Sequence, residues 1–147
     1  MTTSTNLRLD DQLCFALYAA TNQITRAYRP LLDSIGLTYP QYLVMLVLWE
    51  ADRRRISDIA GRLQLAPHAL SAMLRRLETA GLVERRVDGT DGRVVNVALT
   101  AAGRALESAA SRAQHDVVDQ TGLCGEDLGD LREALHDLVL GMSTESA

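Results

Sequence analysis

The chain has 147 residues, which is enough for one domain with a hydrophobic core. Its apolar fraction of 47% is ordinary for a globular protein, and no apolar run reaches the roughly 18 residues that a membrane span needs. The formal net charge of −4 excludes a protein that is basic throughout. Because the first residues are polar and lack a signal-peptide pattern, we expect a cytoplasmic protein with no membrane partner.

The first predicted helix begins near Asp10, which is a suitable cap, and closes between Asp33 and Gly36. Pro30 lies late in this segment and is expected to bend or end the helix. Apolar residues recur at helical spacing at Leu9, Leu13, Ala16, Leu17, Ala20, Ile24, Ala27, Leu31 and Leu32.

A second helix is predicted from Thr38 onward. Gln41 follows Thr38 by three residues, which is the spacing of a capping box, and Pro40 is tolerated in a first turn. The apolar run 42–49 fits a strand by periodicity alone, but the capping signal and the length favour a buried helix.

Two short helices joined by a turn come next. The first covers 56–63 with Ser57 as its expected cap, and the second begins with Pro67 in its first turn and ends at Gly81. Helix, short turn and helix is the arrangement with which many proteins bind DNA. The core stripe of the second helix consists of Leu70, Met73, Leu74 and Leu77.

The segments 82–87 and 94–99 are rich in β-branched residues and flank a run of turn-forming residues at 88–93. This pattern predicts a β-hairpin. A hairpin directly after a DNA-reading helix is the wing of a winged helix.

The last third is predicted to be helical. Thr100 caps a helix to about Gln120, Gly122 and Gly125 break it around Cys124, and a last helix covers roughly 126–142. The first and last helices have more apolar surface than one small lobe can cover, so we expect them to pack against a second copy.

The predicted fold class is therefore mainly α with a small β-hairpin wing. We expect one winged helix-turn-helix chain over 1–147, with a DNA-binding lobe at 37–99. Segments 1–36 and 100–147 are expected to supply the dimerisation helices of an intertwined homodimer, which would place two reading helices about one DNA turn apart.

Positive charge is concentrated in the predicted lobe. Residues 51–93 contain nine arginines and six acidic residues, whereas the rest of the chain contains six arginines and thirteen acidic residues. This distribution favours binding of double-stranded operator DNA by the middle of the chain. No cofactor or metal is expected, because the cysteines and His68, His115 and His136 lack the spacing of a metal site.

The second helix of the pair is expected to enter the major groove. Its first-turn and outward residues Pro67, His68, Ser71 and Arg75 would face bases, although His68 is as plausible an inert surface residue. Arg76 and Arg62 are better placed for phosphates. The run Arg53 to Arg55 is either a phosphate contact or a solvated loop. Arg93 at the wing tip is expected to contact a groove or phosphate, oriented by Asp91, or to stiffen the hairpin through an ion pair.

The segment from Leu82 to Gly103 resembles the wing signature of the MarR family of repressors. The residues that carry the resemblance are Arg86, Asp88, Asp91, Arg93, Leu99, Thr100 and Gly103. The resemblance implies a dimeric winged-helix regulator that a small molecule or an oxidant releases from DNA. It also adds Arg86 to the expected DNA-binding residues.

Two further segments, 9–18 and 37–50, resemble the organic hydroperoxide resistance regulators within this family. The resemblance implies that Cys14 is a reactive thiol that organic hydroperoxides oxidise, and that Tyr28 and Tyr39 hydrogen-bond it. Tyr18, one helical turn from Cys14, is a weaker candidate for the same role, and like Tyr42 it also fits a core or interface position.

The chemistry of Cys14 is consistent with this role. A cysteine in the first turn of a helix lies where backbone amides favour a thiolate, although Asp10 and Asp11 oppose this. Cys14 and Tyr28 are fourteen residues apart, about 21 Å along one helix, so Tyr28 can serve Cys14 only from a partner subunit. Without the resemblance, a buried structural cysteine would be the default interpretation.

In two-cysteine relatives a carboxy-terminal cysteine of the other subunit attacks the oxidised thiol, so the resemblance implies an intersubunit disulfide between Cys14 and Cys124. An inert loop thiol is the alternative for Cys124. Two other functions stay open for the chain: a thiol peroxidase, and a MarR-type repressor that a phenolic ligand releases while Cys14 is structural.

Overall fold

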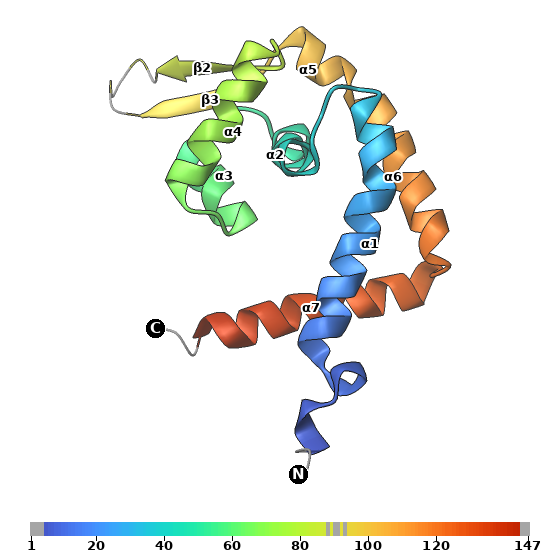
Figure 1. Ribbon diagram of the computed structural model, residues 1–147. Coiled ribbons are helices and arrows are strands. Elements are labelled where there is room, and N and C mark those ends of the chain that lie inside the picture. Colours follow the sequence, from blue (N-terminus) through green and yellow to red (C-terminus); the bar gives the residue numbers. More distant parts are fainter. Residues whose placement is uncertain (1–4, 88, 90–91, 93, 145–147) are drawn as a thin grey trace. The chain divides into compact units, whose positions relative to one another are not determined.

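The computed structural model describes residues 5–87, 89, 92 and 94–144 (Figure 1). It is mostly helical with one small antiparallel sheet, as predicted. The chain forms two compact units, Met1–Ala113 and Gln114–Ala147. The predicted division into a 37–99 lobe and terminal dimerisation helices stays a prediction. Among the described residues, no helix combines the length and the apolar character needed to cross a membrane.

Helix α1 spans Leu13–Asp33 and follows two short 3-10 turns, Thr5–Leu7 and Leu9–Asp11. The prediction that Asp10 caps this helix is wrong, because Asp10 belongs to the second turn and Gln12 is the N-cap residue. The Gln12 side chain gives no cap either, since its amide donates to the carbonyls of Asn6 at 2.8 Å and Arg8 at 2.9 Å. Pro30 lies inside α1 and does not end it.

Helix α2 spans Tyr39–Glu50 and has the predicted capping box. The Gln41 backbone N–H donates to the Thr38 hydroxyl at 3.3 Å, and the Thr38 backbone N–H donates to the Gln41 side chain at 3.0 Å. This helix is the centre of the core, which explains its continuous apolar run. Its buried residues are Tyr42, Val44, Met45, Val47 and Leu48.

Helices α3 (Ile56–Leu63) and α4 (Pro67–Thr79) form the predicted helix-turn-helix. Pro67 is the first residue of α4, and the predicted stripe is buried at Leu70, Leu74 and Leu77, while Met73 is half-buried. Ser57 is not the cap of α3, contrary to the prediction. The N-cap residue is Arg55, whose backbone is extended because it belongs to a strand.

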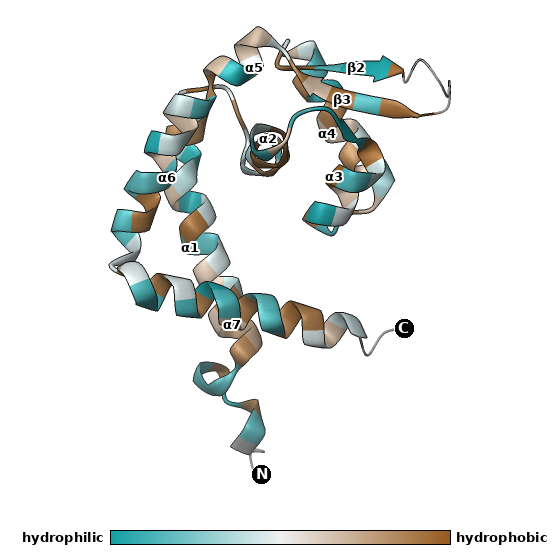
Figure 2. Ribbon diagram, turned by 180° about the vertical axis from the view of Figure 1, so that it is seen from behind, coloured by the Kyte–Doolittle hydropathy of each residue, from teal (hydrophilic) through white to brown (hydrophobic). Residues whose placement is uncertain are grey.

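The sheet has three strands in the order β1–β3–β2, all antiparallel. Strands β2 (Val83–Val87) and β3 (Val95–Leu99) form the predicted hairpin, with Val83 opposite Leu99. Strand β1 (Arg54–Arg55) was not predicted; it adds to β3 just before α3 begins. Figure 2 shows β2 as mostly hydrophilic and β3 as mostly hydrophobic, which fits the burial of β3 toward its carboxyl end.

The predicted long helix after Thr100 is divided at Leu106 into α5 (Ala101–Ala105) and α6 (Glu107–Thr121). Thr100 caps α5 as expected, because its hydroxyl accepts from the Gly103 backbone N–H at 3.1 Å. Gly122, with a φ of +69°, follows α6 and gives the predicted break before Cys124. Helix α7 spans Gly125–Thr144 and buries none of its residues.

Candidate nucleic-acid interface and thiol site

Helix α4 exposes the side chains that sequence reasoning assigned to DNA. Pro67, His68, Arg75 and Arg76 are all exposed, and Ser71 is half-buried. The Ser71 carbonyl accepts a long hydrogen bond of 3.4 Å from the Arg85 guanidinium of β2. The face of α4 that does not contribute to the core therefore carries two arginines and a histidine at its surface.

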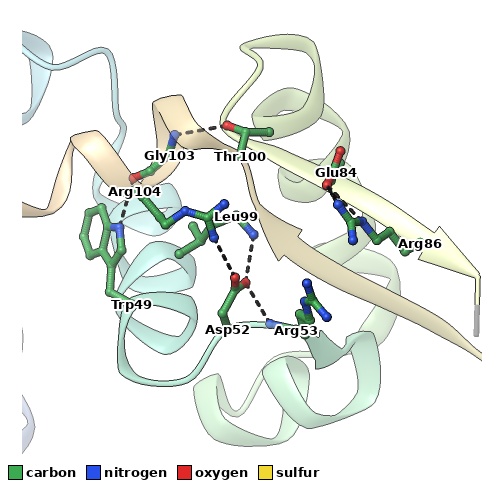
Figure 3. Close-up of polar contacts among 9 residues, drawn as sticks. All are labelled: Trp49, Asp52, Arg53, Glu84, Arg86, Leu99, Thr100, Gly103 and Arg104. Atoms are coloured by element: carbon green, nitrogen blue, oxygen red, sulfur yellow. Dashed lines mark hydrogen bonds and ion pairs between the residues drawn. The ribbon is translucent and has the colours of Figure 1, made fainter.

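Other arginines of the predicted DNA-binding lobe already have acidic partners. Arg62 of α3 is 2.8 Å from the Glu50 carboxylate at the end of α2, and this ion pair holds the pKa of Glu50 below its usual range. Arg86 is paired with Glu84 two residues earlier on β2 (Figure 3). Arg85 is likewise paired with Glu78 of α4. These pairs were not predicted, and they partly neutralise the charge that sequence reasoning assigned to DNA.

The arginine run before α3 is structured. Arg53 is exposed with a φ of +58°, Arg54 donates to the Ala51 carbonyl at 3.3 Å, and Arg55 is exposed on β1. Pairing of β1 with β3 places Arg54 and Arg55 beside the base of the wing, so these two residues do not belong to a free loop. Arg93, Asp91 and Asp88, expected at the wing tip, lie outside the described residues.

A polar junction joins the end of α2 to β3 and α5, and sequence reasoning missed it. One oxygen of the Asp52 carboxylate accepts from the backbone N–H groups of Arg53 and Leu99, both at 2.8 Å. The other oxygen accepts from Arg104 of α5 at 3.1 Å (Figure 3). A single carboxylate thus bonds both to the last residue of the wing and to the last turn of the following helix.

Trp49 adds a second connection at this junction. Its indole N–H donates to the Gly103 carbonyl at 3.0 Å. Gly103 itself lies against the backbone of Leu82, so close that a Cβ built on it would be 2.1 Å from the Leu82 carbonyl oxygen. The Thr100 hydroxyl donates to the carbonyl of Gly81 at 2.6 Å. Thr100 and Gly103 gave a sequence signal, Thr100 as a predicted helix cap and both as part of the wing resemblance, whereas Trp49 gave none.

Cys14 is the second residue of α1, so the expected position in the first helical turn is confirmed. In the single chain its side chain is exposed and takes no part in a disulfide. Cys124 is exposed too, and it directly precedes α7, whose Asp127 N–H donates to the Cys124 carbonyl at 3.0 Å. Tyr18, one turn after Cys14, is 66% exposed.

The two tyrosines expected to serve the thiol lie together in one aromatic cluster with Tyr42. Ring centroids are 5.5 Å apart for Tyr28 and Tyr39, 5.1 Å for Tyr28 and Tyr42, and 6.1 Å for Tyr39 and Tyr42. The hydroxyls of Tyr28 and Tyr42 are 3.5 Å apart. Because Tyr28 and Cys14 are both on α1, the structure gives no contact between them within one chain.

The surroundings of the tyrosine cluster keep its phenols protonated. Burial raises the pKa of Tyr28 far above its ordinary value, and the hydrogen bond with Tyr42 raises it further. Burial also raises the pKa of Tyr39 and of Tyr42, although the hydrogen bond with Tyr28 acts in the opposite direction for Tyr42. At neutral pH all three hydroxyls therefore remain donors, which is what a thiolate partner requires.

Within the part of the chain that the structure describes, no group of three or more His, Cys, Asp or Glu side chains is placed to hold a metal ion. The chemistry that the described residues offer is that of arginines on one helix face, a thiol and a group of phenols.

Comparisons with known proteins agree with this geometry. Residues 37–95 match the model of the MarR family. The organic hydroperoxide resistance transcriptional regulator of Bacillus subtilis is 37% identical over 91% of both chains. The regulator TtmR of Methylorubrum extorquens is 44% identical over 93% of this chain and 68% of its own.

Solved structures give the same fold. AbfR of Staphylococcus epidermidis superimposes with a TM-score of 0.77 at 30% identity, over 95% of this chain and 96% of AbfR. Reduced AbfR bound to DNA gives the same TM-score at 31% identity, over 93% and 95% of the two chains. The expectation of a regulator and not an enzyme is confirmed by these relatives, and the chain belongs to the MarR family of winged-helix transcriptional regulators.

Proposed function

We propose that the chain is a cytoplasmic repressor that senses organic hydroperoxides. In this proposal a reduced homodimer binds operator DNA and leaves it when Cys14 is oxidised. The observation that carries the proposal is an exposed thiol in the first turn of α1, in a chain that also buries a cluster of protonated tyrosines. Its likeness over 91% of its length to a regulator named for organic hydroperoxide resistance supports the same function.

DNA binding is assigned to α4 and the wing. The exposed Pro67, His68 and Arg75 would face bases, and Arg76 would contact a phosphate. Ser71 is a secondary candidate because it is half-buried. Arg86, Asp91 and Arg93 are assigned to the wing contact, and Arg86 would have to exchange its Glu84 partner for a phosphate. Reduced AbfR has been solved bound to DNA, which supports this assignment.

A homodimer accounts for the apolar side chains that the terminal helices leave exposed. Leu13, Phe15 and Ile24 of α1 are 60%, 38% and 38% exposed, and Leu131 and Leu140 of α7 are 49% and 65% exposed. Apolar side chains of this size and number are typical of surfaces that pack against a partner. A second copy of the chain is the proposed partner.

The dimer also provides the thiol with its phenols. Tyr28 and Tyr39 of one subunit would donate hydrogen bonds to the Cys14 thiolate of the other, because about 21 Å of α1 separates Tyr28 from Cys14 of the same chain. The Tyr39 hydroxyl has no hydrogen-bond partner among the described residues, which leaves it available for this role. Tyr18, being exposed beside Cys14, is the third candidate donor.

The proposed reaction has two balanced steps. The Cys14 thiolate attacks the terminal oxygen of a hydroperoxide, the O–O bond breaks, and the alkoxide takes a proton to leave as an alcohol, so that the sulfur becomes a sulfenic acid. The Cys124 thiol of the other subunit then attacks this sulfur, a disulfide forms and water leaves. AbfR has also been solved in a disulfide form. Release by a phenolic ligand is not favoured, because nothing in that alternative uses the exposed thiol.

Gel-shift titration with and without cumene hydroperoxide tests the proposal. We expect wild type to lose DNA on oxidation and to run as a crosslinked dimer on non-reducing gels. Cys14→Ser should bind DNA and ignore peroxide. Cys124→Ser is the matched control: it should still respond to peroxide through the sulfenic acid but form no crosslink. A Cys14→Ser protein that peroxide still releases would overturn the proposal.

A further inference from the structure

A continuous series of contacts runs from the tyrosine cluster to the turn behind the DNA-reading helix α4. We propose that Trp49 is a positioning residue in this series, and that its hydrogen bond to Gly103 couples the state of the thiol site to the placement of α4 and the wing. The inference rests on the proposed function, because it concerns how oxidation at Cys14 changes DNA affinity.

The upstream part of the series is aromatic. Tyr42 contacts Tyr28 through both its ring and its hydroxyl, and its ring is 6.5 Å from that of Trp49. Tyr42 and Trp49 are seven residues apart on α2, about two helical turns, so both project from the same face of one rigid helix. A change in the hydrogen bonding of Tyr28 therefore acts directly on the ring that contacts Trp49.

The downstream part consists of backbone contacts that leave little freedom. Trp49 donates to the Gly103 carbonyl at 3.0 Å, and Gly103 is packed against the carbonyl of Leu82 with no room for a methyl group. Thr100, the cap of α5, donates to Gly81 at 2.6 Å. Residues 81 and 82 connect the end of α4 to β2. A displacement of α5 at Gly103 must therefore move the connection that places α4 relative to the wing.

The proposed coupling links the tyrosine cluster at one end of the series to the turn after α4 at the other end. In the reduced dimer the Cys14 thiolate holds Tyr28 in one position. Oxidation replaces that acceptor with a neutral sulfenic acid or a disulfide, so the phenol loses the partner that held it. The Tyr42 and Trp49 rings can then repack. The position of α5 that favours DNA binding is then no longer the one of lowest free energy. A densely packed core transmits such a change because it has discrete arrangements.

The test measures DNA affinity of reduced and of peroxide-treated protein and compares the ratio of the two dissociation constants. Trp49→Phe removes the N–H donor together with the five-membered ring that carries it, and keeps a six-membered aromatic ring. We expect the reduced variant to bind DNA with a dissociation constant within about threefold of wild type. The ratio of the dissociation constants of peroxide-treated and reduced protein should fall by about tenfold or more. A change of this size is within the usual range of coupling between two sites. Titration of free thiols should show Cys14 oxidised as fast as in wild type.

Arg104→Ala is the matched control, because it removes an exposed ion pair from the same junction and leaves the Trp49 hydrogen bond intact. It should keep the wild-type ratio. Tyr42→Leu, which removes the ring between Tyr28 and Trp49, should lower the ratio as Trp49→Phe does, and it serves if Trp49→Phe does not fold.

Each result decides between the two proposals. A wild-type ratio in Trp49→Phe overturns the coupling role of Trp49 and leaves the proposed function standing. An equal loss in Arg104→Ala also overturns it, because any loosening of the junction would then have the same effect. A wild-type protein that does not respond to peroxide overturns the proposed function, and this inference with it.

Discussion

The winged-helix lobe and the terminal helices use apolar residues in opposite ways. In the lobe, Leu70, Leu74 and Leu77 of α4 are fully buried, and so are Ile59 and Val97 of the elements around them. In α7 no residue is buried, and Leu140 is 65% exposed. The core stripe of α4 is thus covered within the lobe, whereas α7 has apolar residues that the single chain does not bury.

Helix α1 has both characters within 21 residues. Its carboxyl half buries Tyr28 and Leu32, while its amino half leaves Leu13 and Phe15 exposed around Cys14. Cys14 is therefore on the part of the helix that we assign to a partner, and Tyr28 is on the part that belongs to the core. The difference teaches that the proposed sensor segment and a segment of the core are adjacent on one helix, so the proposal requires that a change at one reaches the other.

The largest effect is expected in the lobe core. Leu74→Ala should lower the free energy of unfolding by about 2 to 5 kcal/mol, because Leu74 is fully buried and its loss leaves a cavity. Urea unfolding followed by circular dichroism measures the change. Leu140→Ala is the control on α7, and a similar loss at low protein concentration there would remove the distinction between the two regions.

Gly103→Ala tests the junction at the boundary of the lobe. The added methyl group would lie 2.1 Å from the Leu82 carbonyl oxygen, so the backbone must shift. We expect a destabilisation of about 3 kcal/mol, near the upper end for overpacked sites. Thermal unfolding checks it against Gly61→Ala, where the new methyl group has no described atom within 4 Å beyond its chain neighbours and the backbone of its own helix. Equal melting temperatures for the two variants would contradict the close packing at 103.

A charge introduced on the exposed apolar residues of α7 should weaken the proposed dimer. Leu140→Glu places a carboxylate on an exposed apolar residue of α7, so the dimer dissociation constant should rise about tenfold or more, which corresponds to about 1.4 kcal/mol. Sedimentation equilibrium measures it. Glu133→Gln, an exposed polar change on the same helix, should leave association unchanged. If Leu140→Glu also leaves it unchanged, this part of α7 lies outside the interface.

The smallest effect concerns the cap of α5. Thr100→Ala removes the side-chain acceptor for Gly103 and the donor to Gly81, and it should cost about 1 kcal/mol. Thr79→Ala is the matched control, because the Thr79 hydroxyl donates to the Arg75 carbonyl of its own helix and, among the described residues, to no other element. Urea midpoints compare the two variants. A larger loss for Thr79→Ala would mean that the cap is not what Thr100 contributes.

Local signals predicted much of the fold. The capping box at Thr38 and Gln41, Pro67 at the start of α4 and Thr100 before α5 were all correct, because each depends on residues a few positions apart. The predicted cap of α3 was wrong for a non-local reason. Because β1 pairs with β3 some forty residues later in the chain, the helix begins at Ile56, and Ser57 lies inside it. No short-range pattern contains that pairing.

The candidate site shows the same division between local features, which were predictable, and contacts between distant elements, which were not. Exposed residues on α4 and the position of Cys14 followed from helical periodicity and from the resemblance. The ion pairs of Arg62 and Arg86, the three bonds of Asp52 and the Trp49–Gly103 contact were not predictable, since most join elements that are far apart in sequence. These contacts are what orient the DNA-binding surface.

Trp49 is the single tryptophan of the chain, and its indole N–H is bonded to a backbone carbonyl beside the wing. The tryptophan fluorescence of the protein therefore originates entirely at the junction between α2 and α5. The emission maximum of an indole depends on the polarity around the ring and on the hydrogen bonding of its N–H group. A shift of this wavelength on adding peroxide would therefore report movement at the junction between α2 and α5. The protein thus contains its own optical probe for the proposed response, and no label is needed to test for it in real time.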